Sequence, residues 1–178
     1  MARKPAARHF VTEEWSADSG MRYHPEQLEI AVAGRNVLRQ GGLLVYSTCS
    51  LDPLQNEAVI AALLSLGGLV LLDVSAKLSI GVRPGLIQWD VWNSAAACWY
   101  GAQMEPGAGV RSRSFHREPT LFAPSPNVAG ALGLQRCVRL LPGDFDAAGC
   151  FVAVMRRTKS HDGLEASDGS EELPPAVR

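Results

Sequence analysis

Cys49 is the residue whose type and position best suit covalent chemistry in this chain. It follows the apolar run Leu43 to Ser47, typical of a strand buried on both faces, and precedes Asp52 and Pro53, which suit a helix start. The carboxyl end of such a strand is the edge where open α/β sheets place ligands. The positive end of the following helix favours thiolate, the nucleophilic form of cysteine. The alternative is a small buried packing residue, because free cysteine is often buried.

The other cysteines and the histidines show no local pattern for metal binding. The chain has four of each, without a Cys-x-x-Cys pair and without zinc-ligand spacing. The sequence therefore predicts no metal site. We expect the remaining cysteines to be structural: Cys98, Cys137 and Cys150.

Arg113 and Arg117 are candidate phosphate ligands, since they flank the aromatic ring of Phe115 on which a base could stack. A solvated charged loop is the alternative explanation. Glu57 has two possible roles. It could orient a catalytic or substrate group, or it could be an exposed residue in the first turn of a helix. The tryptophans could also stack a base, but aromatic residues in a loop over a sheet are more often core: Trp89, Trp92 and Trp99.

Helices and strands alternate around Cys49. The expected order is a helix over Pro25 to Gln40, a strand over Leu43 to Ser47, a helix over Pro53 to Leu66 and a strand over Leu69 to Val74. For the second helix, Asp52 is the predicted N-cap, and Gln55 stands where a capping-box partner reaches back. This order predicts half of a doubly wound α/β domain with a parallel sheet.

Beyond the second strand the periodicity is lost. Residues 75–134 are rich in glycine and proline and read as a loop-rich insertion whose tryptophans pack on the sheet. The runs Gln135 to Leu141 and Cys150 to Met155 predict a terminal antiparallel hairpin. Residues 158–178 are polar and acidic, so we expect a domain over residues 1–157 and a disordered tail.

Length and charge restrict the class of protein. The 178 residues suffice for about one domain, and 47% hydrophobic residues fit a globular chain. The net charge of −1 gives no whole-protein attraction to nucleic acid or to an anionic membrane. The apolar runs are too short for a membrane helix, and no secretory segment is visible. We therefore expect a soluble protein with reduced thiols in an intracellular compartment.

The sequence around Cys49 resembles the Sun-domain (Fmu-type) RNA cytosine-5 methyltransferases. The resemblance rests on Gly-Gly at 41–42, Tyr-Ser-Thr-Cys-Ser-Leu at 46–51, Pro53 and Asn-Glu at 56–57. Three further stretches agree in order: 24–34 with the preceding helix, 85–89 with a segment of the eukaryotic tRNA-methylating branch, and 139–154 with the closing hairpin. The resemblance covers about residues 1–157.

This resemblance implies the C-terminal half of a Rossmann-like methyltransferase sheet that ends in the antiparallel hairpin. Cys49 is then the nucleophile that adds to carbon 6 of cytosine, so that carbon 5 can accept the methyl group of S-adenosylmethionine. Thr48 and Ser50 are the implied substrate-binding neighbours. The implied partner is RNA, with tRNA favoured, in the nucleus or cytoplasm.

Other family elements have no counterpart in this sequence. They are the glycine-rich cofactor loop, the acidic residue for the ribose and the Pro-Cys-Ser element. The nearest glycine pattern, residues 107–109, lacks a strand before it. Gly143 and Cys150 stand where the family often has histidine and glycine. We therefore expect the chain to be inactive alone, with the N-terminal half of the same domain as its partner. The alternatives are a non-catalytic RNA- or partner-binding remnant and a truncated gene model.

Overall fold

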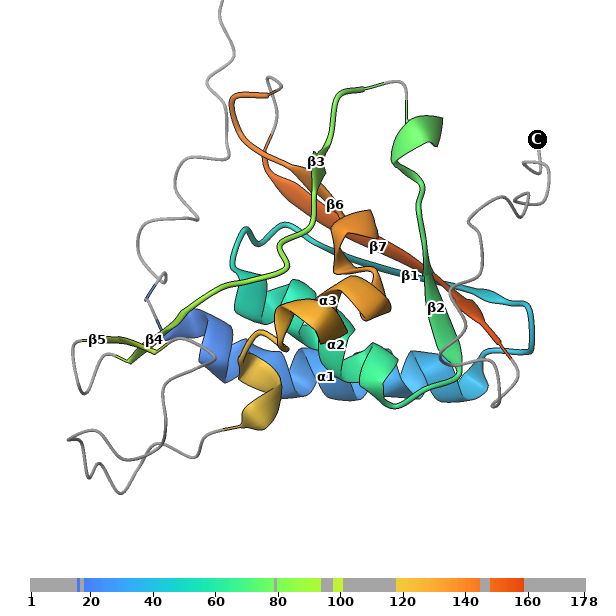
Figure 1. The fold of residues 1–178 in the computed structure, drawn as a ribbon, viewed down its shortest axis with the longest axis horizontal. Coiled ribbons are helices and arrows are strands. Elements are labelled where there is room, and N and C mark those ends of the chain that lie inside the picture. Colours follow the sequence, from blue (N-terminus) through green and yellow to red (C-terminus); the bar gives the residue numbers. More distant parts are fainter. Residues whose placement is uncertain are drawn as a thin grey trace, which may run out of the picture.

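Five strands form the main sheet of the computed structural model, which describes residues 16, 18–78, 80–93, 98–100, 118–144 and 148–158. Figure 1 shows the sheet with the helices beside it. The predicted α/β class is confirmed. The five strands are β1 (Leu43–Thr48), β2 (Leu69–Leu72), β3 (Arg83–Pro84), β6 (Val138–Leu140) and β7 (Cys150–Arg157).

The last strand, β7, is the centre of the sheet. One edge of β7 pairs with β1 along most of its length. On the other edge, the first residues of β7 pair with β6 and its last residues pair with β2. Every described pair is antiparallel, which contradicts the predicted parallel sheet. The reason is that β1 and β2 run in the same direction but are separated by β7. The predicted closing hairpin is confirmed as β6 and β7. However, β7 also pairs with β1 and β2, so it is the central strand of the sheet and not an edge strand.

Helix α1 (Ser19–Val37) begins before the predicted start and contains Pro25 in its interior. A proline inside a helix removes one backbone hydrogen bond, so the sequence favoured a start at that residue. Tertiary contact outweighs this loss, because the preceding turn carries the fully buried His24. The helix ends before Gly41 as expected.

The predicted second helix is divided in two. The 3₁₀ turn η2 (Pro53–Gln55) is followed by α2 (Glu57–Ser65), with Asn56 in a non-helical conformation between them. Asp52 caps η2 as predicted by accepting from the Leu54 N–H. The predicted capping box is absent: the backbone N–H of Asp52 donates to Ser50, and the Gln55 side chain instead accepts from Gln27.

Strand alternation divides the sheet into a covered and an open face. Tyr46 of β1 and Phe151, Ala153 and Met155 of β7 belong to the core covered by the helices. The opposite face of β1 is open among the described residues, with Val45 60% exposed. The expectation that β1 is buried on both faces is therefore wrong for these residues. β2 also ends earlier than predicted, because Asp73 accepts hydrogen bonds from the N–H and hydroxyl of Ser75.

Residues 75–134 contain more regular structure than predicted. β3 joins the main sheet, while β4 (Val91–Asn93) and β5 (Cys98–Tyr100) form a separate hairpin. α3 (Pro126–Leu132) packs near α2, with short 3₁₀ turns η3 (Ser75–Lys77), η4 (Pro119–Leu121) and η5 (Leu134–Arg136).

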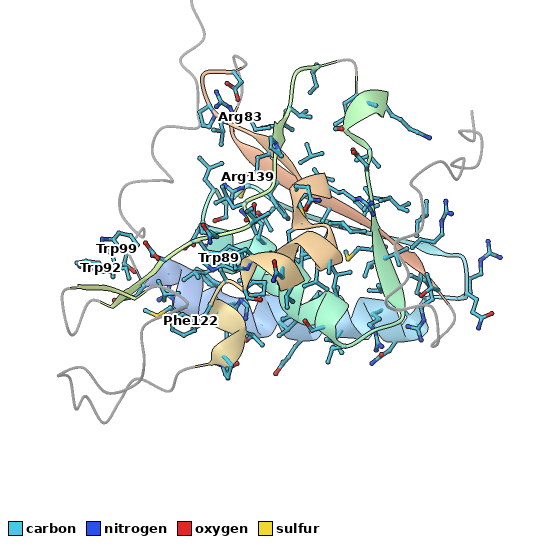
Figure 2. The ribbon with its side chains drawn as sticks, viewed as in Figure 1. Arg83, Trp89, Trp92, Trp99, Phe122 and Arg139 are labelled. Atoms are coloured by element: carbon cyan, nitrogen blue, oxygen red, sulfur yellow. The ribbon has the colours of Figure 1, made fainter. Side chains whose placement is uncertain are left out.

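The labelled tryptophans differ in burial (Figure 2). Trp89 is in the core as expected, and its indole N–H donates to Leu121 O at 2.8 Å. Trp92 and Trp99 pack together on the β4–β5 hairpin with ring centroids 5.2 Å apart. Trp99 is 61% exposed, so the expectation that it is core is wrong.

Several expectations lie outside the described residues. These are Arg113 and Arg117, the glycine pattern at 107–109 and the tail beyond Thr158. Among the helices that the structure does describe, none combines the length and apolar character needed to cross a membrane.

Candidate functional site

Cys49 directly follows β1 and has an exposed, free thiol. It lies at the carboxyl end of the strand, as the sequence predicts. The explanation of Cys49 as a buried packing residue is therefore wrong. An exposed thiol at this position is accessible to a reacting molecule.

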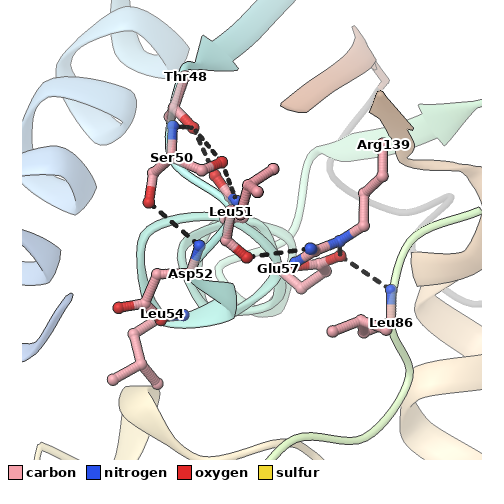
Figure 3. A network of polar contacts seen from close by, with 9 residues as sticks. Thr48, Ser50, Leu51, Asp52, Leu54, Glu57, Leu86 and Arg139 are labelled. Atoms are coloured by element: carbon pink, nitrogen blue, oxygen red, sulfur yellow. Dashed lines mark hydrogen bonds and ion pairs between the residues drawn. The ribbon is translucent and has the colours of Figure 1, made fainter. Parts of the chain in front are cut away.

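The turn after β1 is fixed by side chains rather than by regular structure (Figure 3). Thr48 Oγ1 donates to Asn56 Oδ1 at 2.6 Å and accepts from the Ser50 N–H at 3.2 Å. Asn56 Nδ2 in turn donates to Ser50 O at 2.9 Å. Thr48 and Ser50 thus hold the backbone on both sides of Cys49, and their predicted contact with substrate remains a prediction.

A buried ion pair between Glu57 and Arg139 also holds this turn (Figure 3). Arg139 of β6 donates to both carboxylate oxygens of Glu57 at 2.6 Å. Its remaining nitrogen, Nη1, donates to Leu51 O at 3.0 Å, and Glu57 also accepts from the Leu86 N–H at 2.8 Å. The pair therefore connects the Cys49 turn, the start of α2, β6 and the segment after β3.

The structure contradicts one of the two roles expected for Glu57, that of an exposed residue in a first helical turn. Its side chain is 0% exposed, so Glu57 does not occupy an exposed helical turn. Arg139 was not expected from the sequence as the partner of Glu57. A usable signal was present: residues 58–64 are apolar on every side, and a helix of that kind is buried all round. A charged residue in its first turn then requires a buried partner.

His24 joins α1 to the region after the Cys49 turn. Nδ1 lies 2.7 Å from Leu54 O, which can only accept, so Nδ1 carries the hydrogen. Nε2 lies 3.0 Å from Thr120 Oγ1, a hydroxyl oxygen that can donate to a ring nitrogen or accept from it. Burial lowers the pKa of His24, opposed by the Leu54 hydrogen bond and by the charges of Glu118 and Asp52. Burial in the folded chain thus favours the neutral form of His24.

We expect this histidine to make stability depend on pH. Because the pKa of folded His24 lies below the ordinary 6.5, the unfolded chain binds a proton first as the pH falls. The free energy of unfolding should therefore decrease below pH of about 6.5, by at most about 1.4 kcal/mol per pH unit for one proton. Urea unfolding of the chain and of His24→Asn, which keeps a donor for Leu54, isolates this contribution. Equal pH slopes in the two proteins would contradict it.

The described glycine pairs do not stand where a cofactor loop would place them. A cofactor loop places glycines after a strand and before a helix. The glycine pairs at 41–42 and 67–68 precede β1 and β2 instead, and the turn after β1 contains no glycine. Within the described residues there is also no group of three or more metal-binding side chains.

The other cysteines differ in environment. Cys137 is buried, and burial raises its pKa far above the ordinary value, so its thiol stays protonated. This fits the structural role expected for Cys137. Cys150 is a partly exposed free thiol at the start of β7.

Comparison with known proteins identifies relatives of this chain. Residues 4–81 match the family model described as 16S rRNA methyltransferase RsmB/F. The chain is 38% identical over 170 residues to the multisite-specific tRNA:(cytosine-C(5))-methyltransferase trm4b of Schizosaccharomyces pombe, covering 91% of this chain and 24% of that protein. The multisite-specific tRNA:(cytosine-C(5))-methyltransferase of Saccharomyces cerevisiae is 30% identical over 170 residues, covering 92% of this chain and 23% of that protein.

A crystal structure of a methyltransferase homologue from Pyrococcus horikoshii also matches, with a TM-score of 0.49 and 25% identity, over 80% of this chain and 33% of that chain. The chain spans about a quarter of the length of the two curated yeast relatives. The family resemblance stated from residues 46–57 is confirmed by the sequence matches. Over the matched residues, the chain is similar to the RsmB/F methyltransferases and to the tRNA:(cytosine-C(5))-methyltransferases of the two yeasts.

Proposed function

We propose that this chain forms part of an enzyme that methylates carbon 5 of cytosine in tRNA, with Cys49 as its nucleophile. The single observation that carries the proposal is the exposed thiol of Cys49 at the end of β1. The surrounding turn is held by Asn56 and by the Glu57–Arg139 pair. The names of the yeast relatives support tRNA as the substrate class.

The proposed role of Cys49 follows from the chemistry of cytosine. Carbon 5 is a poor nucleophile until a thiolate adds to carbon 6 and makes the ring enamine-like. The Cys49 sulfur would form this bond, and it would leave after a base removes the carbon 5 proton. The target base must first leave its stack, which costs a few kcal/mol in a duplex and less in a loop. An exposed thiol is compatible with entry of such a base.

The methyl group would come from S-adenosylmethionine held by a part of the domain other than the described residues. The open strand edge supports this division. Among the described strands, β1 pairs only with β7, so its other edge has free backbone groups that can pair with a further strand. The exposed Val45 gives the adjoining sheet face an apolar surface to cover. We propose a reducing compartment, the nucleus or cytoplasm, as the site of action.

A chimaeric enzyme tests the proposal. In it, this chain replaces the matching segment of the Schizosaccharomyces pombe relative, to which it is 38% identical. With labelled S-adenosylmethionine and unmodified tRNA, we expect the chimaera to label carbon 5 of cytosine and the 178-residue chain alone to give no turnover. A folded chimaera without activity would contradict the proposed function. Turnover by the 178-residue chain alone would contradict the proposed division of the site.

A further inference from the structure

Cys49 and Cys150 lie opposite each other across two neighbouring strands. The antiparallel register pairs Ser47 with Val152 and Thr48 with Phe151. Continued by one residue, this register places Cys49 opposite Cys150, the first residue of β7. Directly opposed residues of antiparallel strands point to the same face and have Cα atoms about 4.5–5.5 Å apart. That separation lies within the roughly 4.4–6.8 Å that a disulfide spans.

A second observation shows that the two segments stay together past this point. A Cβ on Gly149 would lie 2.7 Å from Leu51 Cδ2, so these residues are in contact. The Thr48–Phe151 pair therefore lies on one side of the two cysteines, and the Leu51–Gly149 contact lies on the other. The backbone of Cys150 is also held by its pairing with Leu140 of β6.

Both thiols are available for reaction. Cys49 is exposed and Cys150 is partly exposed, and both are free. Within the described part of the chain, the Cys150 sulfur makes a long contact with Phe151 O, at 3.6 Å, and a thiol is a weak donor, so this contact does not fix its rotamer. Neither sulfur is enclosed in the core, in contrast with Cys137.

We propose that Cys49 and Cys150 form an oxidation site at which a hydroperoxide closes a reversible disulfide. Hydrogen peroxide oxidises one thiol to a sulfenic acid and is itself reduced to water. The second thiol attacks the sulfenic sulfur, an S–S bond forms, and the oxygen leaves as a second water. Two thiols and one peroxide thus give one disulfide and two waters. A dithiol reductant reverses the step.

The consequence for methyl transfer rests on the proposed function, whereas disulfide formation does not. A Cys49 sulfur bonded to Cys150 cannot bond to cytosine, so oxidation would stop the proposed reaction. The disulfide would also protect Cys49 from irreversible oxidation to sulfinic acid. Cys150 would therefore be a resolving cysteine beside the proposed nucleophile.

Peptide mapping of the 178-residue chain tests the pair directly. Trypsin releases Cys49 alone on residues 40–77 and Cys150 alone on residues 140–156. After limited hydrogen peroxide, we expect these two peptides to be linked, with equal loss of both free thiols and full recovery on reduction. The same oxidation in concentrated urea should give much less of this link, because the register is then lost.

Two variants separate the possible outcomes. Cys150→Ser should remove the link and leave Cys49 as a sulfenic acid, detectable as a dimedone adduct, or as a sulfinic acid, detectable by the mass of two added oxygens. Cys137→Ser should leave the link unchanged. Oxidised Cys49 beside an unmodified Cys150 in the original chain would overturn the proposal, as would a link between two chains. The disulfide is mapped on the 178-residue chain, whereas methyl transfer is measured on the chimaera. An inactive chimaera would therefore contradict the proposed function without affecting the disulfide proposal.

Discussion

Replacing Cys49 with alanine in the chimaeric enzyme is expected to lower methyl transfer to tRNA by at least about 10³-fold, the scale of losing the nucleophile of a covalent mechanism. The reason is that no other described thiol can replace it at the end of β1 without a change of geometry. Cys150 is held in β7, and Cys137 is buried. Single-turnover labelling of tRNA with labelled S-adenosylmethionine measures the loss.

Two controls make this result specific. Cys137→Ser changes a buried thiol elsewhere and should keep methyl transfer within a few-fold of the unchanged chimaera. Binding of tRNA by Cys49→Ala should also persist, because the sulfur acts in the reaction rather than in holding RNA. Near-normal turnover by Cys49→Ala would remove Cys49 from the mechanism and would favour a binding role for this chain.

Arg139→Met is expected to give a large loss of stability, about 3–5 kcal/mol, because it leaves a buried carboxylate without its ion-pair partner. Glu57 would keep only the Leu86 N–H, and Leu51 O would lose its donor. Arg139→Lys should recover only part of the loss, since an ammonium cannot make the bidentate contact. Urea unfolding of the 178-residue chain measures the difference.

The sheet offers a matched control for this pair. Arg83 of β3 lies opposite Arg139 and also pairs with a carboxylate, Asp144, but its side chain is 59% exposed. Arg83→Met should therefore change stability little. The double variant Glu57→Leu with Arg139→Met should lose less stability than the sum of the two single variants, because the double variant leaves no buried charge without a partner, whereas each single variant does. Additive losses would show that the two residues do not act as a pair.

The sequence predicted the parts of the fold that depend on local pattern. The helix before β1, the Asp52 cap, β1 and the closing hairpin all follow from residue type and spacing within short segments. The order of strands in the sheet depends on contact between distant segments, and β7 enters between β1 and β2 from the far end of the described chain. Apolar runs alone predicted a parallel sheet because they do not record which strand lies between them.

Only part of the candidate site could be predicted, because some of its contacts also join segments that are distant in the sequence. The position and exposure of Cys49 relate to local sequence, since a strand ends and a turn begins there. Its support does not: Arg139 reaches Glu57 and Leu51 from β6, far along the chain. The opposition of Cys49 and Cys150 likewise appears only once the register of β1 and β7 is known.

The measurement that tests the central claim most directly is the capture of a covalent bond between Cys49 and cytosine. In tRNA that carries 5-fluorocytidine, the fluorine at carbon 5 cannot leave as a proton does, so the adduct persists after methyl transfer. With the chimaera and S-adenosylmethionine, mass spectrometry should find the nucleotide attached to Cys49 on residues 40–77. Attachment to a different residue, or methylation of tRNA without any adduct at Cys49, would contradict the account.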